Sequence, residues 1–289
     1  LMKNTYSYTT DGRVGLHSRG EEINTKLGRI IGRRFTDYRK RWDAASAFEI
    51  ETTFPLFIQL DMNQTCNLSC VQCPLDNFDA VKHVYGGNEL KFSDYKRIVD
   101  EGQEHNCPSL SPCGLNEPLL MKDLEEYISY AEKKGFIDII LVTNGTALTE
   151  KRAKKLLDSG LTRIRFSLDA VSRETYEKIR GSKNYDKVIR NISRFIELKE
   201  AGGYKLPVTG ANLCKINLNS HETDKFYDYW IDKVDTVAIQ QFTPTVPDAG
   251  FEKYYPDYQF NLDVDVDQFQ CPQPQHRVVL RNNYITPCC

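Results

Sequence analysis

The feature that most constrains the fold is an alternation of strand-like and helix-like segments that begins at Phe57. The strand-like segments cover 57–62, 108–113, 137–145, 161–170, 206–216 and 235–242. The segments with helical spacing cover 92–105, 120–135, 149–160, 173–201 and 221–233. This order predicts an α/β fold with parallel strands, because parallel neighbours need long crossover connections. Ser93 is the expected N-cap of the first helix, and Gly135 is expected to follow the end of the second.

Size and charge exclude some classes of protein. The 289 residues suffice for one large or two modest domains. A net charge of −2 argues against a chain-wide nucleic-acid or membrane-binding surface. No apolar run approaches the roughly 20 residues of a membrane span, and the first residues, LMKNTYSYTTDG, lack an apolar signal core. Nine cysteines without a disulfide-like spacing then predict a cytoplasmic protein with reduced thiols.

Composition divides the chain into three parts. Residues 1–50 form a polar N-terminal extension with a basic run at 26–41, KLGRIIGRRFTDYRKR. That run is interpreted either as a solvated helix face or as a contact for an anionic partner. Residues 51–245 carry the alternation and form the main domain. Residues 246–289 break the alternation and contain three cysteines, Cys271, Cys288 and Cys289, which predicts a second, smaller module.

Three cysteines crowd the loop after the first predicted strand, in the segment CNLSCVQC. In a parallel sheet this loop lies at the end where functional residues gather. Structural zinc sites normally have four ligands, whereas each iron of a cubane [4Fe–4S] cluster usually takes one thiolate. Cys66, Cys70 and Cys73 would therefore leave one iron free for a substrate or cofactor. Zinc completed by a distant residue, or three incidental buried thiols, are the alternatives.

The Cys-x₃-Cys-x₂-Cys spacing after a first strand resembles the signature of radical S-adenosylmethionine (SAM) enzymes. Further segments at the predicted strand ends resemble the motifs of the same family. They are GLNEPLL at 114–120, TNG at 143–145, SLDA at 167–170 and YEKIRG at 176–181. The resemblance covers about 55–245 and implies a partial (β/α)₆ TIM-like barrel.

The resemblance also implies cofactors and chemistry. Cys66, Cys70 and Cys73 would hold a [4Fe–4S] cluster whose fourth iron is chelated by the amino and carboxylate groups of SAM. An electron from the reduced cluster would cleave SAM to a 5′-deoxyadenosyl radical, which abstracts a hydrogen atom from the substrate. A flavodoxin or ferredoxin type of electron donor is implied as a partner.

Site roles carry over by resemblance onto the matching positions. Glu117 would accept hydrogen bonds from the SAM amino group, and Arg180 would pair with its carboxylate. Ser167 and Asp169 would face the ribose hydroxyls or the methionyl part. The other residues expected at the SAM site are Gly114, Pro118 and Asn144. The alternative for such polar residues is an ordinary turn or helix cap.

Two positions depart from the family pattern. Asn116 replaces the usual second glycine of the Gly-Glu-Pro motif, and we expect it to tolerate the positive φ of that turn. Gln72 replaces the residue before the third cysteine, which is often aromatic in the family, so side-chain stacking is not expected there.

The last nineteen residues, CPQPQHRVVLRNNYITPCC, resemble the start of a SPASM or twitch module. Such modules hold auxiliary iron–sulfur clusters and open with a cysteine, a strand and Gly-x₄-Cys. Asn283 takes the glycine position, which suits a hairpin turn. The hairpin would bring Cys271 and Cys288 together as two ligands. Further cysteines of the module do not follow, so we interpret the sequence as truncated; without them these two cysteines would be free or bind a different metal.

Three other cysteines have no place in these motifs. Cys107 and Cys113 flank the second predicted strand, and Cys113 is expected close to the SAM site. Cys214 in the fifth predicted strand is a candidate hydrogen-atom donor, the one catalytic candidate that the sequence offers. The competing interpretation of all three is a small buried hydrophobe.

These inferences predict a radical SAM oxidoreductase or isomerase that oxidises or epimerises a small molecule of sugar or aminocyclitol type. The first fifty residues look too short for a peptide-recognition domain. Modification of a ribosomal peptide or protein side chain is therefore the alternative activity. An iron–sulfur or zinc scaffold or sensor without catalysis is the alternative of another class.

Overall fold

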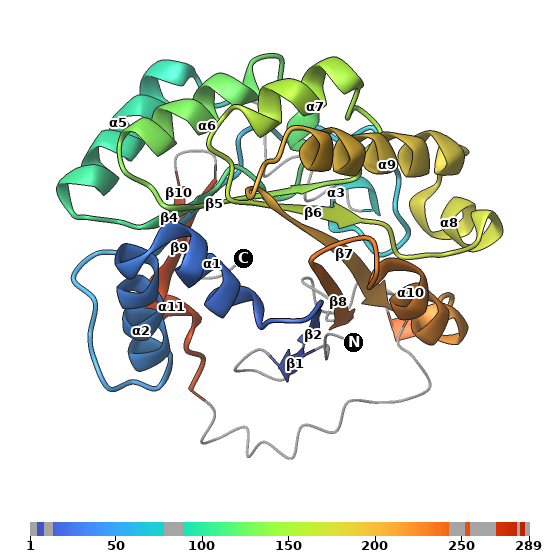
Figure 1. Ribbon diagram of the computed structural model, residues 1–289, viewed down its shortest axis with the longest axis horizontal. Coiled ribbons are helices and arrows are strands. Elements are labelled where there is room, and N and C mark those ends of the chain that lie inside the picture. Colours follow the sequence, from blue (N-terminus) through green and yellow to red (C-terminus); the bar gives the residue numbers. More distant parts are fainter. Residues whose placement is uncertain are drawn as a thin grey trace.

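A curved sheet with helices along its outer face dominates the computed structural model (Figure 1). The structure describes residues 5–8, 14–77, 89–242, 252–254, 270–281 and 284–286. Within these ranges the strand order is β1-β2-β8-β7-β6-β5-β4-β3-β9-β10. Figure 1 shows helices α5, α6, α7 and α9 over one face of the sheet, with α1 and α2 on the other side.

The centre of the sheet consists of parallel strands joined by crossover helices. The strands are β3 (Phe57–Leu60), β4 (Ser109–Ser111), β5 (Asp138–Thr143), β6 (Arg163–Ser167), β7 (Val208–Lys215) and β8 (Thr236–Gln241). The helices are α5 (Phe92–Glu104), α6 (Leu124–Lys133), α7 (Glu150–Leu157), α8 (Arg173–Arg180), α9 (Tyr185–Ala201) and α10 (Thr223–Trp230). Short turns of helix are α3 (Pro74–Asn77), η1 (Pro118–Leu120), η2 (Ser220–Glu222) and η3 (Glu252–Tyr254). The predicted α/β partial barrel is confirmed.

Helix boundaries differ from the sequence prediction in two places. The N-cap of α5 is Lys91 rather than Ser93, and its side chain makes no capping hydrogen bond. The stretch predicted as one helix over 173–201 is two helices, because Gly181 follows α8 in the left-handed conformation, with φ +61°. Gly135, with φ +93°, follows α6 as expected.

The alternation of side chains along β6 separates the core from the interior. Ile164 and Phe166 are fully buried in the apolar layer between sheet and helices, where the Phe166 ring meets that of Phe195 edge-on at 6.0 Å. Side chains alternate between the two faces of a strand. The neighbouring positions, Arg163 and Ser167 among them, therefore point to the opposite, concave face, which we call the interior face.

The N-terminal segment covers the end of the sheet where the strands begin. It comprises β1 (Thr5–Tyr8), β2 (Val14–Ser18), α1 (Ile23–Ile31) and α2 (Arg33–Ser46), and β2 pairs antiparallel with β8. Leu27 and Phe35 of the two helices share a buried cluster with Leu56 and Val208, which lie at the starts of β3 and β7. The basic run is only partly solvated, because Lys26 Nζ lies 2.5 Å from the buried Asp235 carboxylate.

The C-terminal segment joins the same sheet. It comprises α11 (Gln273–His276), β9 (Arg277–Arg281) and β10 (Tyr284–Thr286). β9 pairs parallel with β3, and β10 pairs antiparallel with β9, which confirms the predicted hairpin. Asn283 at its turn and Cys288 lie outside the described residues, and the division of the chain at residues 50 and 245 stays a prediction.

None of the helices in the described part of the chain has the length and apolar character needed to cross a bilayer.

Acidification should weaken the packing of the C-terminal segment against α2, because His276 stands in that contact. Its ring stacks on Trp42 with centroids 3.7 Å apart, and burial, with Arg277 and Arg39 nearby, lowers its pKa from 6.5 to about 4. The unfolded chain takes up the proton near pH 6.5 and the folded chain near pH 4. Stability is therefore fully present above pH 6.5, falls between pH 6.5 and about 4, and levels off below that, with a total loss of about 3 kcal/mol at most.

Replacing His276 by Phe keeps a stacking ring and removes the titration. Urea unfolding at pH 7.5 and at pH 4.5 should show a smaller loss of stability for His276→Phe than for the parent chain. Equal losses in the two proteins would contradict this role for the imidazole.

Candidate functional site

One cavity collects most of the residues that the motifs singled out. Cys66, Cys70 and Cys73 lie in the loop between β3 and α3 and line a space of about 230 Å³, which we call the cysteine cavity. Its other predicted lining residues come from the C-terminal ends of strands and from the end of α8: Gly114, Asn116, Glu117, Asn144, Ser167 and Arg180. Among the described residues, no three His, Cys, Asp or Glu side chains are grouped so that they could hold one metal ion.

The cysteine loop is seated on the end of α8. The backbone N–H of Val71 donates to the carbonyl of Ile179 at 2.9 Å, which satisfies a carbonyl of the last helical turn. A Cβ at Gly181 would lie only 2.8 Å from the carbonyl oxygen of Ser69. Glycine at this left-handed position therefore lets the helix end and the loop approach closely.

Gly114 permits a second close approach at the end of β4. A Cβ there would lie 1.0 Å from Oδ1 of Asp61, which accepts the backbone N–H of Leu115 at 3.1 Å. The other oxygen of Asp61 is paired with Arg281 on β9. Asp61 was missed by the motif analysis, although its place directly after the first strand is the signal that could have found it.

The expectation for Asn116 is wrong. Within the described residues, positive φ at non-glycine positions occurs at Phe48, Asn106 and Asp169, and Asn116 is not among them. Its side chain bridges the turn instead: Oδ1 accepts the N–H of Gly114 at 2.8 Å, and Nδ2 donates to Asn63 at 2.7 Å. The turn is thus held by an amide side chain rather than by backbone freedom.

Glu117 is buried and ties two strand ends together. Its Oε1 accepts from Thr143 Oγ1 at 2.6 Å and from the N–H of Leu119 at 3.0 Å, while Oε2 accepts from the N–H of Asn144 at 2.7 Å. Burial raises the pKa of this carboxyl, and these donors oppose the rise. Pro118 begins η1 in the buried turn that follows and is not among the lining residues.

Asn144 points its amide at the cysteine loop. Its Nδ2 donates to Asn67 Oδ1 at 3.0 Å and lies 3.9 Å from the sulfur of Cys66. Its Oδ1 accepts from the N–H and the hydroxyl of Thr146. Asn67 and Thr146 were not singled out from the sequence, because neither residue type marks a site by itself.

Asp169 and Arg180 form a buried ion pair beside Cys70. The Arg180 Nη2 lies 2.9 Å from Asp169 Oδ2, and its Nη1 lies 3.5 Å from the Cys70 sulfur. Burial alone would lower the pKa of Arg180, but the Asp169 carboxylate and the Cys70 sulfur outweigh it and raise the pKa. Asp169 also accepts from Gln72 Nε2 at 2.8 Å and from the N–H of Cys214 at 2.7 Å.

The SAM contacts predicted for Asp169 and Arg180 stay predictions, and the two residues differ in their placement. It does not line the cysteine cavity within the described residues; its carboxylate faces protein donors. Arg180 does line the cavity. Gln72 lines it as well and has a buried Oε1 without a hydrogen-bond partner in the described residues.

The remaining thiols are held as neutral groups. Burial raises the pKa of Cys107 and of Cys113 to about 12 and raises that of Cys214 as well. Cys113 lines the cavity but is engaged with β5, because its sulfur accepts the N–H of Val142 at 3.1 Å. Cys214 does not line the cavity within the described residues, and its role as a hydrogen-atom donor stays a prediction.

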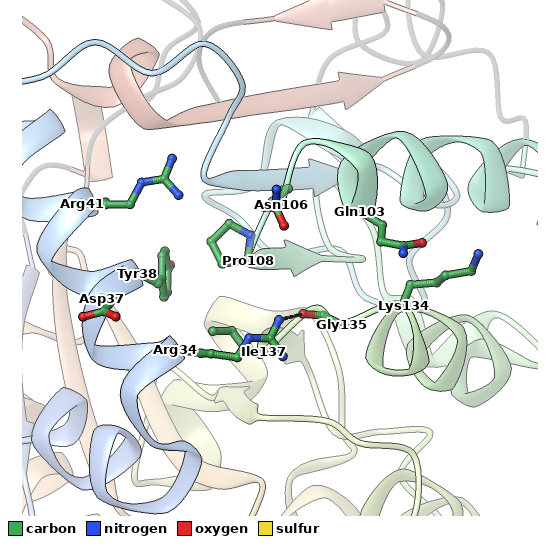
Figure 2. A pocket seen from close by; sticks show the side chains of 11 residues that line it. Arg34, Asp37, Tyr38, Arg41, Gln103, Asn106, Pro108, Lys134, Gly135 and Ile137 are labelled. Carbon is green, nitrogen blue, oxygen red and sulfur yellow. Dashed lines mark hydrogen bonds between the residues drawn. The ribbon is translucent and has the colours of Figure 1, made fainter.

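A larger pocket, of about 440 Å³, lies near the starts of β4 and β5 (Figure 2) and shares no lining residue with the cysteine cavity. Figure 2 shows Arg34, Tyr38 and Arg41 of α2 facing Pro108, with Lys134 at the end of α6, and the Arg34 guanidinium donates to the Gly135 carbonyl at 2.9 Å. Apart from Cys107, none of the residues discussed above as site candidates lines it. The chemistry-bearing groups therefore gather in the smaller cavity.

Comparison with known proteins gives a family for this arrangement. Residues 61–210, just over half of the chain, match the sequence profile of the Radical SAM superfamily. An Fe-coproporphyrin III synthase of Methanosarcina barkeri (strain Fusaro / DSM 804) is 35% identical over 133 residues, which are 46% of this chain and 32% of that protein. A probable GTP 3',8-cyclase of Archaeoglobus fulgidus is 29% identical over 241 residues, 80% of this chain and 73% of that protein.

Solved structures give the same fold at lower identity. SuiB of Streptococcus suis bound to SAM has a TM-score of 0.57 and 16% identity, covering 88% of this chain and 64% of SuiB. SuiB bound to its precursor peptide SuiA has a TM-score of 0.55 and 14% identity, covering 88% of this chain and 63% of SuiB. At such identity the likeness concerns the fold alone.

Proposed function

The chain belongs to the radical SAM superfamily, whose enzymes use a [4Fe–4S] cluster together with SAM, and on this premise we propose that it is an oxidoreductase or isomerase of a small molecule. The observation that supports radical SAM chemistry in this chain is the convergence of Cys66, Cys70 and Cys73 on one cavity at the C-terminal ends of parallel strands. When bound, the reduced cluster and SAM supply a 5′-deoxyadenosyl radical that removes a hydrogen atom from the substrate.

The donor set of the cavity fits a cluster with one iron left for SAM. Three thiols of the loop face the cavity, whereas the fourth thiol there, Cys113, is engaged by the backbone of β5. Asn144 Nδ2 and Arg180 Nη1 lie 3.9 and 3.5 Å from the sulfurs of Cys66 and Cys70. Such donors would stabilise the negative charge of ligating thiolates.

Acceptors in the same cavity suit the amino group and hydroxyls of SAM. Oε2 of Glu117 accepts one hydrogen bond from the protein, and a carboxylate oxygen can accept a second. Gln72 Oε1 is a buried acceptor without a partner in the described residues. Ser167, on the interior face of β6, adds a hydroxyl to the lining. In this proposal Asp169 positions Arg180 rather than contacting SAM.

A small-molecule substrate is favoured by the names of the relatives, which specify GTP and an iron coproporphyrin. The chain spans only about a third of the first of these relatives, so activity is not transferred from it. Modification of a peptide or protein side chain is the alternative, since the fold of this chain is shared with SuiB, which binds the peptide SuiA. A flavodoxin or ferredoxin type of donor would supply the electron.

An auxiliary iron–sulfur cluster is a further part of the proposal. Cys271 is exposed and lies just before α11, and the β9–β10 hairpin follows it in the order that a SPASM or twitch module requires. Its proposed partner ligand, Cys288, lies outside the described residues. Iron in clear excess over the roughly four atoms of one cubane would support a second cluster.

The experiment is to measure 5′-deoxyadenosine released from SAM by the anaerobically reconstituted full chain with dithionite. Release that depends on both dithionite and SAM is expected. A protein with a full complement of iron and sulfide that releases none would contradict the proposal and would favour the scaffold or sensor alternative.

A further inference from the structure

We propose that Arg165 binds an anionic group of the substrate, a carboxylate or a phosphate, on the interior face of the sheet next to the cysteine cavity. The inference deepens the proposed function, on which it rests for the identification of the ligand as a substrate. It starts from a charged side chain whose position in the sheet is fixed by β6.

The alternation along β6 aims Arg165 into the interior. Ile164 and Phe166 on either side of it are fully buried beneath the helices, so Arg165 shares the interior face with Ser167. Ser167 lines the cysteine cavity, and the two positions are one side-chain repeat apart, about 7 Å along the strand. Arg165 therefore leaves the strand on the interior face, one repeat closer to the start of β6 than Ser167.

The residues in register with Arg165 on the neighbouring strands have no polar side chain. In register it faces Val142 of β5, which also lines the cavity, and Gly210 of β7. A Cβ at Gly210 would lie 3.5 Å from Arg165 Cγ and 2.7 Å from Thr236 Oγ1. The tight contact is the one with Thr236, whereas the stem of Arg165 lies at ordinary van der Waals distance from this position.

No carboxylate among the described residues forms an ion pair with Arg165, although that of Asp138 lies near enough to attract its charge. Arg163, the next interior residue on β6, binds Asp138 at 2.7 and 2.9 Å, and Arg180 pairs with Asp169. Arg165 makes neither a hydrogen bond nor an ion pair with the described part of the chain. Burial, with Arg163 and Arg39 nearby, lowers its pKa to about 10 against the attraction of Asp138, so that it still carries its charge at neutral pH.

An unpaired cation in this position does not stabilise the fold. Burying a charge without a partner is costly, whereas a guanidinium fork matches a carboxylate or phosphate with two parallel hydrogen bonds. Arg165 is only partly buried, and it borders a small space of about 10 Å³ together with Arg163, Gly210 and Thr236. Arg165 lies one side-chain repeat before Ser167, which lines the proposed SAM site. An unpaired and partly buried charge at this position fits a ligand-binding residue better than a structural one.

Asn212 adds a second requirement for the ligand. It faces Ser167 in register on β7, and its Oδ1 is buried without a hydrogen-bond partner in the described residues. This oxygen accepts but cannot donate. The substrate class that satisfies both residues carries an anionic group for Arg165 and a hydroxyl or amino donor for Asn212.

The test measures thermal unfolding of the reconstituted full chain in phosphate, in acetate and in chloride at constant ionic strength. We expect the Tm of the parent to rise saturably, by about 5 °C at a hundred times the Kd, with at least one of the two anions. Arg165→Gln should lose this rise, and Arg165→Lys, which keeps the charge but not the fork, should retain part of it. A response to phosphate alone or to acetate alone identifies which anion is the ligand.

A matched control is Arg194→Gln, because Arg194 is an exposed arginine paired with Glu150 and Glu197. It should keep the full anion response of the parent. In chloride, Arg165→Gln should be at least as stable as the parent, since it removes an unpaired cation. The assignment is overturned if neither anion raises the Tm, if Arg165→Gln responds like the parent, or if Arg165→Gln is less stable in chloride.

The 5′-deoxyadenosine assay on the parent separates the two proposals. Release without an Arg165-dependent anion response contradicts the Arg165 assignment and leaves the proposed function standing. An Arg165-dependent response without release supports the anion site and contradicts the radical SAM activity.

Discussion

Joint replacement of Cys66, Cys70 and Cys73 by alanine is expected to abolish both cluster binding and the release of 5′-deoxyadenosine. The three thiols face one cavity, and each iron of a cubane needs its own ligand, so no partial site remains after all three are removed. Iron and acid-labile sulfide should fall to background after anaerobic reconstitution, and the brown colour of the parent should be absent.

Cys107→Ala is the matched control for this variant. Cys107 is also a buried thiol, but it lines the pocket at the other end of the strands. Its replacement should leave the iron content and the release of 5′-deoxyadenosine unchanged. Parent-like iron and release in the triple variant would show that these three cysteines do not ligate the cluster.

Asp169→Ala is expected to lower the free energy of unfolding by about 3–5 kcal/mol, because it leaves Arg180 as a buried and unpaired charge. Two further losses add to this effect. The N–H of Cys214 loses its acceptor, and alanine is poorly suited to the left-handed backbone at this position, with φ +61°. Urea unfolding of the parent and the variant at neutral pH measures the difference.

Asp169→Asn separates the charge from the backbone conformation. Asparagine tolerates the left-handed region and can still accept from Cys214, so this variant should lose less stability than Asp169→Ala. If Asp169→Ala unfolded within about 0.5 kcal/mol of the parent, Arg180 would not depend on this partner, and the ion pair would belong with those of little net effect.

The fold was predictable because two local patterns agree. β-branched segments such as IDIILVT and amphipathic segments such as α7 alternate at the spacing that crossover connections require. The candidate site was predictable for the same reason, since Glu117 and Asn144 follow parallel strands, Ser167 ends one, and the ends of such strands meet at one edge. Ser93 was misjudged because capping depends on where the chain enters the helix, and that is set by packing beyond the local sequence.

What the sequence could not supply is the partner of each polar group. Asp169 looked available for a ligand, yet Arg180, Gln72 and the backbone of Cys214 take up its oxygens. Arg165 was not singled out from the sequence, and only the pairing of its neighbours shows that its charge is unpaired in the described structure. Such differences depend on distances between strands, which no local pattern encodes.

The placement of β9 beside β3 has a consequence for the order of folding. Arg281 lies 220 residues after Asp61. The ion pair between them, next to the turn at Gly114, therefore cannot form until Arg281 has been synthesised. Contacts of such long sequence separation form slowly because a large loop must close first. The cysteine loop leaves the ribosome long before this ion pair can form. Cluster insertion is therefore expected to follow translation rather than to accompany it.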